Sequence, residues 1–423
     1  MNEIDEIVVT GGRPLHGTVR IQGSKNTALP VMAAALLSSG TSVLRECPKI
    51  TDVFLMEKIL RELGAETWWE DHDLYLDCSH ADGTVIPEYF SGKMRSSVIL
   101  LGAMLGRNGK ARTGYPGGCV IGKRPVDLHI QVLQKLGARI VENGNEIQAT
   151  CGKLKGAEVI FPKSSVGATE QGILAAVLAE GKTVFTGCAR EPEITWLCQY
   201  LTGMGAKIEI LENGSICIEG VKKLHPGSGT IPPDRIVAGT YLMAVAATRG
   251  EIILENPPID EMHAILEVYR KMGGQCHRIG GKLIVNGKNA GFPLELLETD
   301  VYPGFPTDLQ SPAMAVLATI PGVSRIREKI FEDRYKLASW LCYMGAKIEI
   351  RDGMAVVHGG YPLRGCIVEA EELRGGAALV IAALAAEGVT RIRGCSFIER
   401  GYEHICEDLT ALGGLLIKDR GTL

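Results

Sequence analysis

A cysteine lies among glycines and cations in the segment RTGYPGGCVIGKRPVDLHI (residues 112–130). Cys119 follows a Pro-Gly-Gly turn and precedes Lys123 and Arg124 by four and five residues. Exposure and neighbouring cations favour the reactive thiolate, so Cys119 is placed to act as an acid or a nucleophile. The other eleven cysteines have no C-x-x-C spacing. We expect them to be small buried side chains, without a disulfide framework or a metal site.

Seven cations fall where predicted helices begin. They are Lys25, Arg95, Arg235 and Arg374 before apolar helices, and Arg124, Arg334 and Arg400 before amphipathic ones. A cation at a helix N-terminus opposes the macrodipole and costs a few tenths of a kcal/mol. Any one of them alone is equally a solvated loop charge. Their recurrence indicates an anion site, because helix N-termini with added Lys or Arg bind phosphate, and predicts a phosphate-rich ligand.

Two further segments have both a functional and an ordinary interpretation. Asp308, in TDVYPGFPTDLQSP (299–312), begins a predicted helix. It is either a partner of the helix dipole or, opposite a cluster of Lys and Arg, a general base. SSVGAT (164–169) enters another predicted helix with small side chains, so its backbone N–H groups could approach an anion. An N-cap by Ser164 or Ser165 is the equally compatible alternative.

A recurrent phrase divides the chain into six repeats. It reads LRELGA, LQKLGA, LTGMGA, YRKMGG, LCYMGA and LTALGG, with a period of about 70 residues. Each phrase ends an amphipathic helix at a glycine suited to the left-handed position after a helix, and alternating strand patterns follow. Upstream lies a segment that is apolar nearly all round, which is typical of a buried helix. Each repeat therefore contains a strand pair, a buried helix, a short strand and an outer helix.

The two ends of the chain are predicted to meet. The sixth repeat stops without its second strand, and VVTGGRPLHGTVR (8–20) matches VVHGGYPLRGCIV (356–368). Residues 1 to about 20 should therefore complete the last repeat. The chain then crosses near Gln22 and again within GSGTIPPD (227–234). This predicts two three-repeat domains, one of residues 21–231 and one of residues 1–20 plus 232–423.

Composition narrows the classes of protein. The 423 residues are 46% hydrophobic and 22% charged, as in folded globular chains. A net charge of -4 gives no reason to bind nucleic acid or an anionic membrane. The longest apolar runs span about ten residues, half of a bilayer crossing, and MNEIDEIVV lacks the basic start of a secretory signal. We expect a cytoplasmic protein.

These segments resemble the UDP-N-acetylglucosamine enolpyruvyl transferase (MurA) family. GSKN, PGGCVIGKRPVDLHI, KSSVGAT, REPEI, GFPTDLQ and ERGYE occur in the family's order over essentially the whole chain. The resemblance implies an inside-out α/β barrel with six βαβαββ-type repeats in two pseudo-threefold domains. It implies transfer of the enolpyruvyl group of phosphoenolpyruvate to the 3′-hydroxyl of UDP-N-acetylglucosamine, through a tetrahedral ketal, in the first committed step of peptidoglycan synthesis. No metal or redox cofactor is implied.

The resemblance also implies roles for residues. Asp308 is expected to be the base near the 3′-hydroxyl, and Cys119 the acid that protonates the methylene carbon, with a covalent thiol adduct as an alternative. Lys25, Arg124 and Arg400 are expected to hold phosphoenolpyruvate, and Lys25 and Arg400 count with the catalytic residues. The other expected substrate-binding residues are Asn26, Arg95, Pro125, Val126, Asp127, Leu128, Lys163, Ser164, Ser165, Val166, Gly167, Ile330, Arg334 and Arg374.

Three functions compete. ELRGG (372–376) and Asp333 depart from the family's usual DLRAS-like and Asn patterns, which leaves a non-catalytic paralogue that binds the nucleotide sugar as one alternative. A transferase that uses another acceptor, such as shikimate 3-phosphate, is a second. Retention of Cys119 and Asp308 favours catalysis, because a binding protein needs neither a thiol nor a carboxylate.

Overall fold

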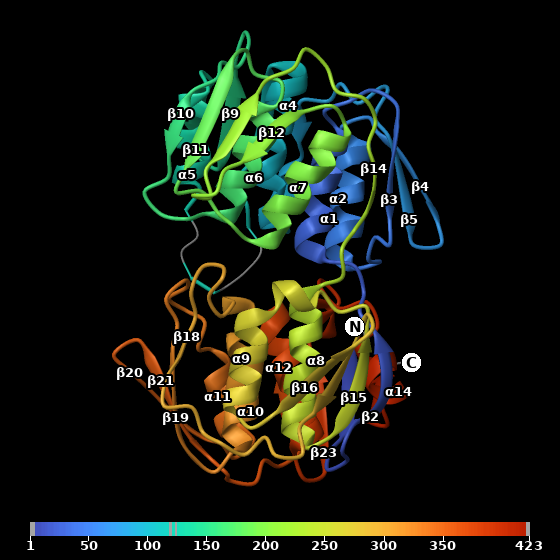
Figure 1. Ribbon diagram of the computed structural model, residues 1–423, viewed down its shortest axis with the longest axis vertical. Coiled ribbons are helices and arrows are strands. Elements are labelled where there is room, and N and C mark those ends of the chain that lie inside the picture. The colour runs from blue at the N-terminus through green and yellow to red at the C-terminus, as the bar shows by residue number, and fades with distance from the viewer. Residues whose placement is uncertain (1–4, 118–120, 123–124, 420–423) are drawn as a thin grey trace. The chain divides into compact units, whose positions relative to one another are not determined.

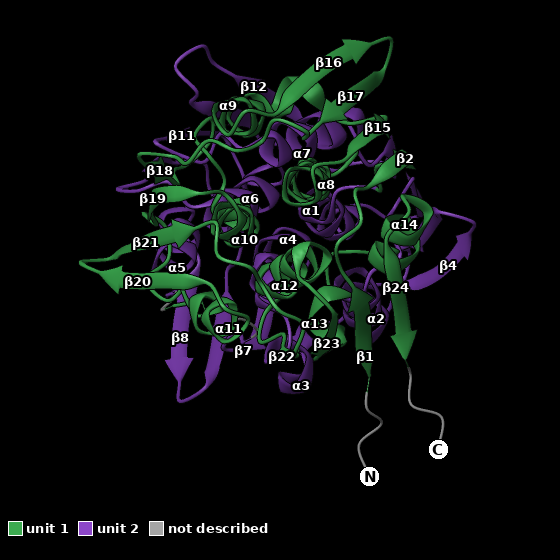
Figure 2. Cartoon of the chain, turned by 90° about the horizontal axis from the view of Figure 1, so that it is seen from below, with its two compact units in different colours: residues 1–22, 120–123, 233–423 green, residues 23–119, 124–232 purple. Residues whose placement is uncertain are grey.

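The computed structural model describes residues 5–117, 121–122 and 125–419. The chain forms two compact units (Figures 1 and 2). Unit 1 consists of residues 1–22, 120–123 and 233–423, and unit 2 of residues 23–119 and 124–232.

Unit 1 contains three four-stranded sheets in its described residues. The strands are β1 (Glu6–Thr10), β2 (His16–Arg20), β15 (Glu251–Glu255), β16 (Gln275–Ile279), β17 (Lys282–Asn286), β18 (Leu297–Glu298), β19 (Gly322–Arg327), β20 (Lys347–Arg351), β21 (Met354–Gly359), β22 (Ile367–Glu369), β23 (Val389–Arg393) and β24 (Leu415–Asp419). Their orders are β22-β23-β1-β24, β16-β17-β15-β2 and β18-β19-β21-β20. In each sheet one outer pair is parallel and the remaining pairs are antiparallel.

Unit 2 repeats this plan. Its strands are β3 (Thr41–Arg45), β4 (Glu66–Glu70), β5 (Asp73–Asp77), β6 (Val85–Ile86), β7 (Lys110–Gly114), β8 (Arg139–Asn143), β9 (Glu146–Thr150), β10 (Glu158–Ile160), β11 (Lys182–Thr186), β12 (Lys207–Ile210), β13 (Ile216–Glu219) and β14 (Ser228–Thr230). Their orders are β14-β3-β5-β4, β6-β7-β9-β8 and β10-β11-β13-β12 among the residues that the structure describes.

The apolar helices lie inside each unit. In unit 1 they are α8 (Arg235–Thr248), α10 (Gln310–Thr319) and α12 (Leu373–Ala385), and in unit 2 they are α1 (Lys25–Ala35), α4 (Leu100–Asn108) and α6 (Val166–Ala176). Most of their residues are buried, as side chains that are apolar on every face require. Figure 2 shows α8, α10 and α12 end-on, with the strands of unit 1 outside them. Helices inside and sheets outside confirm the expected inside-out barrel. No helix in the described part of the chain is long and apolar enough to span a bilayer.

The amphipathic helices each pack against at least one strand of a sheet. They are α2 (Thr51–Glu62), α5 (Asp127–Lys135), α7 (Pro192–Gly203), α9 (His263–Lys271), α11 (Leu337–Tyr343) and α14 (Ile405–Ala411). Each is followed by a glycine with positive φ, from 88° at Gly413 to 111° at Gly345, which confirms the helix ends predicted from the repeated phrase. Two short helices, α3 (Glu88–Ser91) and α13 (Cys395–Ile398), and three 3-10 turns complete the helices of the described residues. The turns are η1 (Arg95–Ile99), η2 (Ile259–Glu261) and η3 (Thr307–Leu309).

The N-terminal segment serves two sheets. β1 lies between β23 and β24 and completes the last repeat, as expected. β2 does not join that repeat: it pairs in parallel with β15, from His16 opposite Glu251 to Arg20 opposite Glu255. β14, which precedes the second crossing, correspondingly pairs with β3 of unit 2. The expectation that residues 1–20 complete one repeat is therefore wrong for β2. Each strand that comes just before the chain passes from one unit to the other, β2 in unit 1 and β14 in unit 2, pairs with a different sheet of the unit that it belongs to.

Glu6 of β1 forms ion pairs with Arg391 and Arg393 of β23, and we expect their contribution to the free energy of unfolding to depend on pH. Glu6 Oε1 accepts from Arg393 Nε at 2.8 Å and Oε2 from Arg391 Nη1 at 3.1 Å. The Arg393 hydrogen bond lowers the pKa of Glu6 below its ordinary value, so its stabilisation is present above the unfolded pKa and is lost as pH falls through the folded value. Glu6→Gln should lower the free energy of unfolding at pH 7 by about 1 kcal/mol.

Urea unfolding at pH 7 and at roughly pH 3 tests this. The difference between wild type and Glu6→Gln should shrink at the lower pH. Glu209→Gln, on the exposed face of β12, is the matched control. Equal losses at both pH values would show that the charge of Glu6 is not what stabilises the sheet.

Candidate active site

The predicted base lies between two buried arginines of unit 1. Asp308 Oδ1 accepts from Arg334 Nη2 at 2.8 Å. Asp308 Oδ2 accepts from Arg374 Nε at 3.2 Å and Nη2 at 3.0 Å. Both arginine side chains are 2% exposed, whereas that of Asp308 is 28% exposed. A carboxylate edge thus remains accessible above two guanidinium groups that fix its orientation.

Local structure places each member of this cluster. Asp308 is the middle residue of η3, which leads directly into buried α10. Arg374 is the second residue of α12, whose N-cap Glu372 accepts from the backbone N–H groups of Arg374 and Gly375. Glu372 therefore performs the capping that a smaller acidic residue provides in the usual pattern, and the arginine keeps its place despite the departure at ELRGG. Arg334 precedes α11.

Arg374 is fully buried and remains charged. Burial lowers its pKa, but the carboxylate of Asp308 is the foremost of several partners that more than offset this, so the pKa is raised overall. Its Cζ lies 5.4 Å from the centroid of the Tyr402 ring, a cation–π distance. Burial raises the pKa of Tyr402, which shares a 2.7 Å hydrogen bond with Thr240. Arg400 stands two residues before Tyr402, in the turn between α13 and α14.

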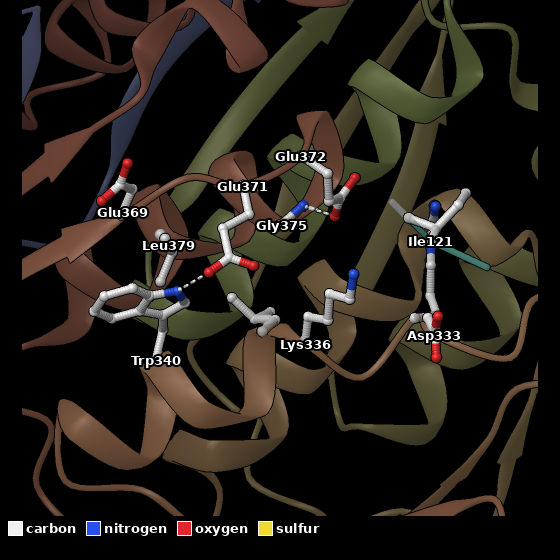
Figure 3. Close-up of a pocket in the computed structure, with 11 residues that line it drawn as sticks. Ile121, Asp333, Lys336, Trp340, Glu369, Glu371, Glu372, Gly375 and Leu379 are labelled. Atoms are coloured by element: carbon white, nitrogen blue, oxygen red, sulfur yellow. Dashed lines mark hydrogen bonds between the residues drawn. The ribbon is translucent and has the colours of Figure 1, made fainter. Parts of the chain in front are cut away.

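A pocket beside Arg334 has the wrong charge for an anion (Figure 3). Its lining contains four carboxyl groups and two cations in the described residues: Asp333, Glu369, Glu371 and Glu372, with Arg334 and Lys336. Glu371 Oε1 accepts from the indole N–H of Trp340 at 3.2 Å. Asp333, the second departure from the family pattern, contributes to this acidic lining. The predicted phosphate site is therefore not this pocket.

In unit 2, the predicted cation Lys25 has a buried acidic partner. Lys25 begins α1, and its Nζ lies 2.7 Å from Asp52 Oδ2 near the start of α2. The side chains are 12% and 3% exposed. Sequence reasoning missed Asp52, because an aspartate in the first turn of a helix is an ordinary dipole partner. Asn26, the next residue of α1, is half-buried.

The structure brings together the segments expected to bind the nucleotide. Arg95, the first residue of η1, donates from Nη2 to the carbonyl of Pro125 at 2.9 Å. Val126 is the N-cap of α5, followed by Asp127 and Leu128 in its first turn. A Cβ on Gly167 would lie 2.8 Å from His129 Nε2. The start of α6 therefore packs closely against the start of α5.

The serine-rich entry to α6 differs from an ordinary cap. Ser165 is the N-cap, but its side chain makes no capping hydrogen bond, so that alternative is wrong for Ser165. Ser164, Val166 and Gly167 are half-buried, and Lys163 is exposed. In unit 1, Ile330 donates its backbone N–H to Glu328 Oε1 at 2.8 Å and is half-buried. Cys119 and Arg124 lie outside the described residues.

Burial makes most of the described thiols unreactive, because it raises their pKa values. It raises the pKa of Cys78 to about 11 and that of Cys198, Cys276, Cys395 and Cys406 to about 12. Cys342 is exposed. Brief treatment with iodoacetamide at pH 7 should therefore modify Cys342 and Cys119 first.

Peptide mass mapping of Cys342→Ser and of Cys342→Ser/Cys119→Ser tests this order. The single variant should keep one rapidly modified site, and the double variant none. Rapid modification at Cys198 or Cys395 would contradict the protection that burial provides.

Comparisons of sequence with known proteins show the family, and a comparison of structure shows the same fold. The sequence model of the family described as EPSP synthase (3-phosphoshikimate 1-carboxyvinyltransferase) matches residues 9–409. The chain is 42% identical to UDP-N-acetylglucosamine 1-carboxyvinyltransferase 2 of Carboxydothermus hydrogenoformans, over 97% of this chain and 98% of the relative. It is 42% identical to UDP-N-acetylglucosamine 1-carboxyvinyltransferase of Koribacter versatilis, over 97% and 95%. The solved structure of the enolpyruvyl transferase NikO from Streptomyces tendae is similar with a TM-score of 0.89 at 24% identity, over 98% of this chain and 99% of that chain.

Proposed function

The chain belongs to the UDP-N-acetylglucosamine 1-carboxyvinyltransferase family, and from this premise we propose that it transfers the enolpyruvyl group of phosphoenolpyruvate to UDP-N-acetylglucosamine. The acceptor atom is the sugar 3′-oxygen, and inorganic phosphate is released. The reaction belongs to peptidoglycan biosynthesis. The observation that carries the proposal is the placement of Asp308 on two buried guanidinium groups, because the chemistry needs a carboxylate close to cations.

Asp308 is the base in the proposed mechanism. It accepts the proton of the 3′-hydroxyl as the oxygen bonds to C2 of phosphoenolpyruvate, and Cys119 supplies a proton to C3. The resulting ketal then returns a proton from C3 to the Cys119 thiolate as the bond from C2 to the phosphate oxygen breaks, and the phosphate leaves with the proton that Asp308 had accepted. Arg374 and Arg334 hold Asp308 in place, so that the proton acceptor is oriented before the substrate arrives.

The anionic substrates are held by cations and helix starts. Lys25, Arg124 and Arg400 contact phosphoenolpyruvate, and Arg95 supports them by fixing Pro125. Asn26 contacts the sugar. The segments 124–128 and 163–167, with Ile330, contact the nucleotide. Support comes from the buried Lys25–Asp52 pair and from the close approach of α5 and α6, which preorganise those groups.

Two coarser assignments accompany this function. We assign residues 21–231 and residues 1–20 plus 232–423 to two domains, each with three repeats, and we place the protein in the cytoplasm. UDP-N-acetylglucosamine is preferred over shikimate 3-phosphate as acceptor, because relatives named for the nucleotide sugar are 42% identical, whereas the EPSP synthase structure from Acinetobacter baumannii is 19% identical.

The test is phosphate release from phosphoenolpyruvate with each acceptor in turn. Turnover with UDP-N-acetylglucosamine and none with shikimate 3-phosphate is the expected result. Turnover only with shikimate 3-phosphate would show that shikimate 3-phosphate, and not UDP-N-acetylglucosamine, is the acceptor. Binding of the nucleotide sugar without any phosphate release would make the chain a non-catalytic paralogue.

Gly167→Ala should weaken nucleotide binding. The added methyl would lie 2.8 Å from Nε2 of buried His129, which pushes the starts of α5 and α6 apart. We expect the KM for UDP-N-acetylglucosamine to rise about tenfold with kcat changed less, because displacements of this kind disturb substrate contacts. Gly152→Ala is the matched control, since no atom lies within 4 Å of its added Cβ. A KM that is unchanged in Gly167→Ala would remove residues 163–167 from the nucleotide site.

A further inference from the structure

The turn that carries Arg400 is held by a side chain from a distant part of the sequence. The Arg400 turn is defined as residues 399–404, between α13 and α14. Gln22 donates from Nε2 to the carbonyl of Gly401 at 3.2 Å and accepts at Oε1 from the backbone N–H of Glu403 at 2.8 Å. Both ends of one amide are therefore used on the two peptide groups that flank Tyr402.

Glutamine is the side chain that fits these two partners. A carbonyl needs a donor and an N–H needs an acceptor, and a primary amide presents one of each side by side. A glutamate would offer acceptors alone, and a methionine of similar length would offer neither. The pair of hydrogen bonds thus specifies the residue type at position 22 and not only its size.

Gln22 is itself fixed through its backbone. Its carbonyl accepts from the N–H of Asp234 at 2.9 Å. The backbone N–H of the preceding residue, Ile21, donates to the backbone carbonyl of Glu255, at the end of the β2–β15 ladder, at 3.0 Å. The carboxylate of Asp234 caps α8 through the N–H groups of Ile236 and Val237. Gln22 therefore connects a rigid helix start and a sheet edge to the Arg400 turn.

The turn has a second set of anchors that does not involve Gln22. The Tyr402 hydroxyl is hydrogen-bonded to Thr240 of α8 at 2.7 Å, and the N–H of Gly401 donates to Ile398 at 3.1 Å. These contacts keep the turn folded when the amide is removed. What the amide adds is restraint of the two peptide groups that flank Tyr402, which begin one residue after Arg400, so its loss should affect the orientation of the turn more than its folding.

We propose that Gln22 is a positioning residue that orients the Arg400 turn for the anionic substrate of the transfer reaction. The proposal rests on the proposed function, in which Arg400 contacts phosphoenolpyruvate. Gln22 acts through Arg400 and touches no reacting atom. A guanidinium that binds a carboxylate or a phosphate with two parallel hydrogen bonds is sensitive to small rotations of its backbone, which is why the turn needs more than its own two anchors.

Steady-state kinetics of the full-length protein test the role. Gln22→Met should raise the KM for phosphoenolpyruvate about tenfold and leave the KM for UDP-N-acetylglucosamine within about twofold. Gln22→Glu, which keeps an acceptor for Glu403, should have a smaller effect on the same constant. Gln199→Met, on the exposed face of α7, is the matched control and should match wild type. If Gln22→Met fails to fold, Gln22→Glu tests the proposal instead: its KM for phosphoenolpyruvate should rise more than its KM for UDP-N-acetylglucosamine.

A double-mutant cycle separates positioning from general damage to the fold. In an Arg400→Lys background, Gln22→Met should change the KM for phosphoenolpyruvate by less than about threefold, because the group that it orients has already been altered. A full tenfold effect in that background, equal rises in both KM values, or a Gln22→Met protein that matches wild type would each overturn the proposal. Failure of the proposed function is distinct, because the wild type would then release no phosphate with the nucleotide sugar.

Discussion

Replacing Asp308 with asparagine is expected to lower the kcat for phosphate release by about 10³-fold, within the range that a general base contributes. Asparagine keeps the size of the side chain and one acceptor for the arginines, but it cannot take the proton of the 3′-hydroxyl. The exposed edge of Asp308 is the part that meets a substrate, since the side chain is 28% exposed while its two partners are 2% exposed. Phosphate release with saturating substrates measures the loss.

The same substitution should also destabilise unit 1. Two buried guanidinium groups would lose their counterion, which costs about 3 kcal/mol when one partner of a buried ion pair is removed. Kinetics must therefore be compared at a temperature where circular dichroism shows both proteins folded. Asp260→Asn, which removes a carboxylate 78% exposed and paired with Arg278, is the control for loss of a charge. A kcat within tenfold of wild type in Asp308→Asn would exclude Asp308 as the base.

Arg374→Lys is expected to lower kcat/KM for phosphoenolpyruvate about 100-fold, which corresponds to about 2.7 kcal/mol of transition-state stabilisation. Arg374 uses Nε and Nη2 together on Asp308 and places its planar group at the ring of Tyr402. A lysine has one ammonium group, which cannot reproduce either contact at the end of a buried, flexible chain. Arg374→Lys keeps the positive charge but should therefore not keep the orientation of Asp308.

The control is an exposed arginine, Arg327, which forms an ordinary surface ion pair. Arg327 pairs with Glu298 at 3.1 Å, and its side chain is 48% exposed, so Arg327→Lys should leave kcat/KM within twofold of wild type. A double substitution, Arg374→Lys with Asp308→Asn, should be no slower than Asp308→Asn alone, because Arg374 acts through that carboxylate. Additive losses would mean that Arg374 contributes by a separate contact.

The amino-acid sequence by itself determined the architecture of this protein. Segments apolar on all faces, such as the one that forms α12, have no arrangement in water except burial, and the repeated glycines need a left-handed backbone that side chains disfavour. Both signals are local, so they can be read from one sequence. The same holds for the assignment of family, because motifs such as PGGCVIGKRPVDLHI are carried by consecutive residues.

Only the tertiary structure decided which partners these local features take. Nothing in an alternating strand pattern states that β2 pairs with β15 while β1, a few residues earlier, pairs with β23 and β24. The clusters of Asp308 with Arg334 and Arg374, of Lys25 with Asp52, and of Gln22 with the Arg400 turn join residues from 26 to 381 positions apart. Their geometry depends on how the buried helices pack, which is a property of the whole fold and not of any single segment.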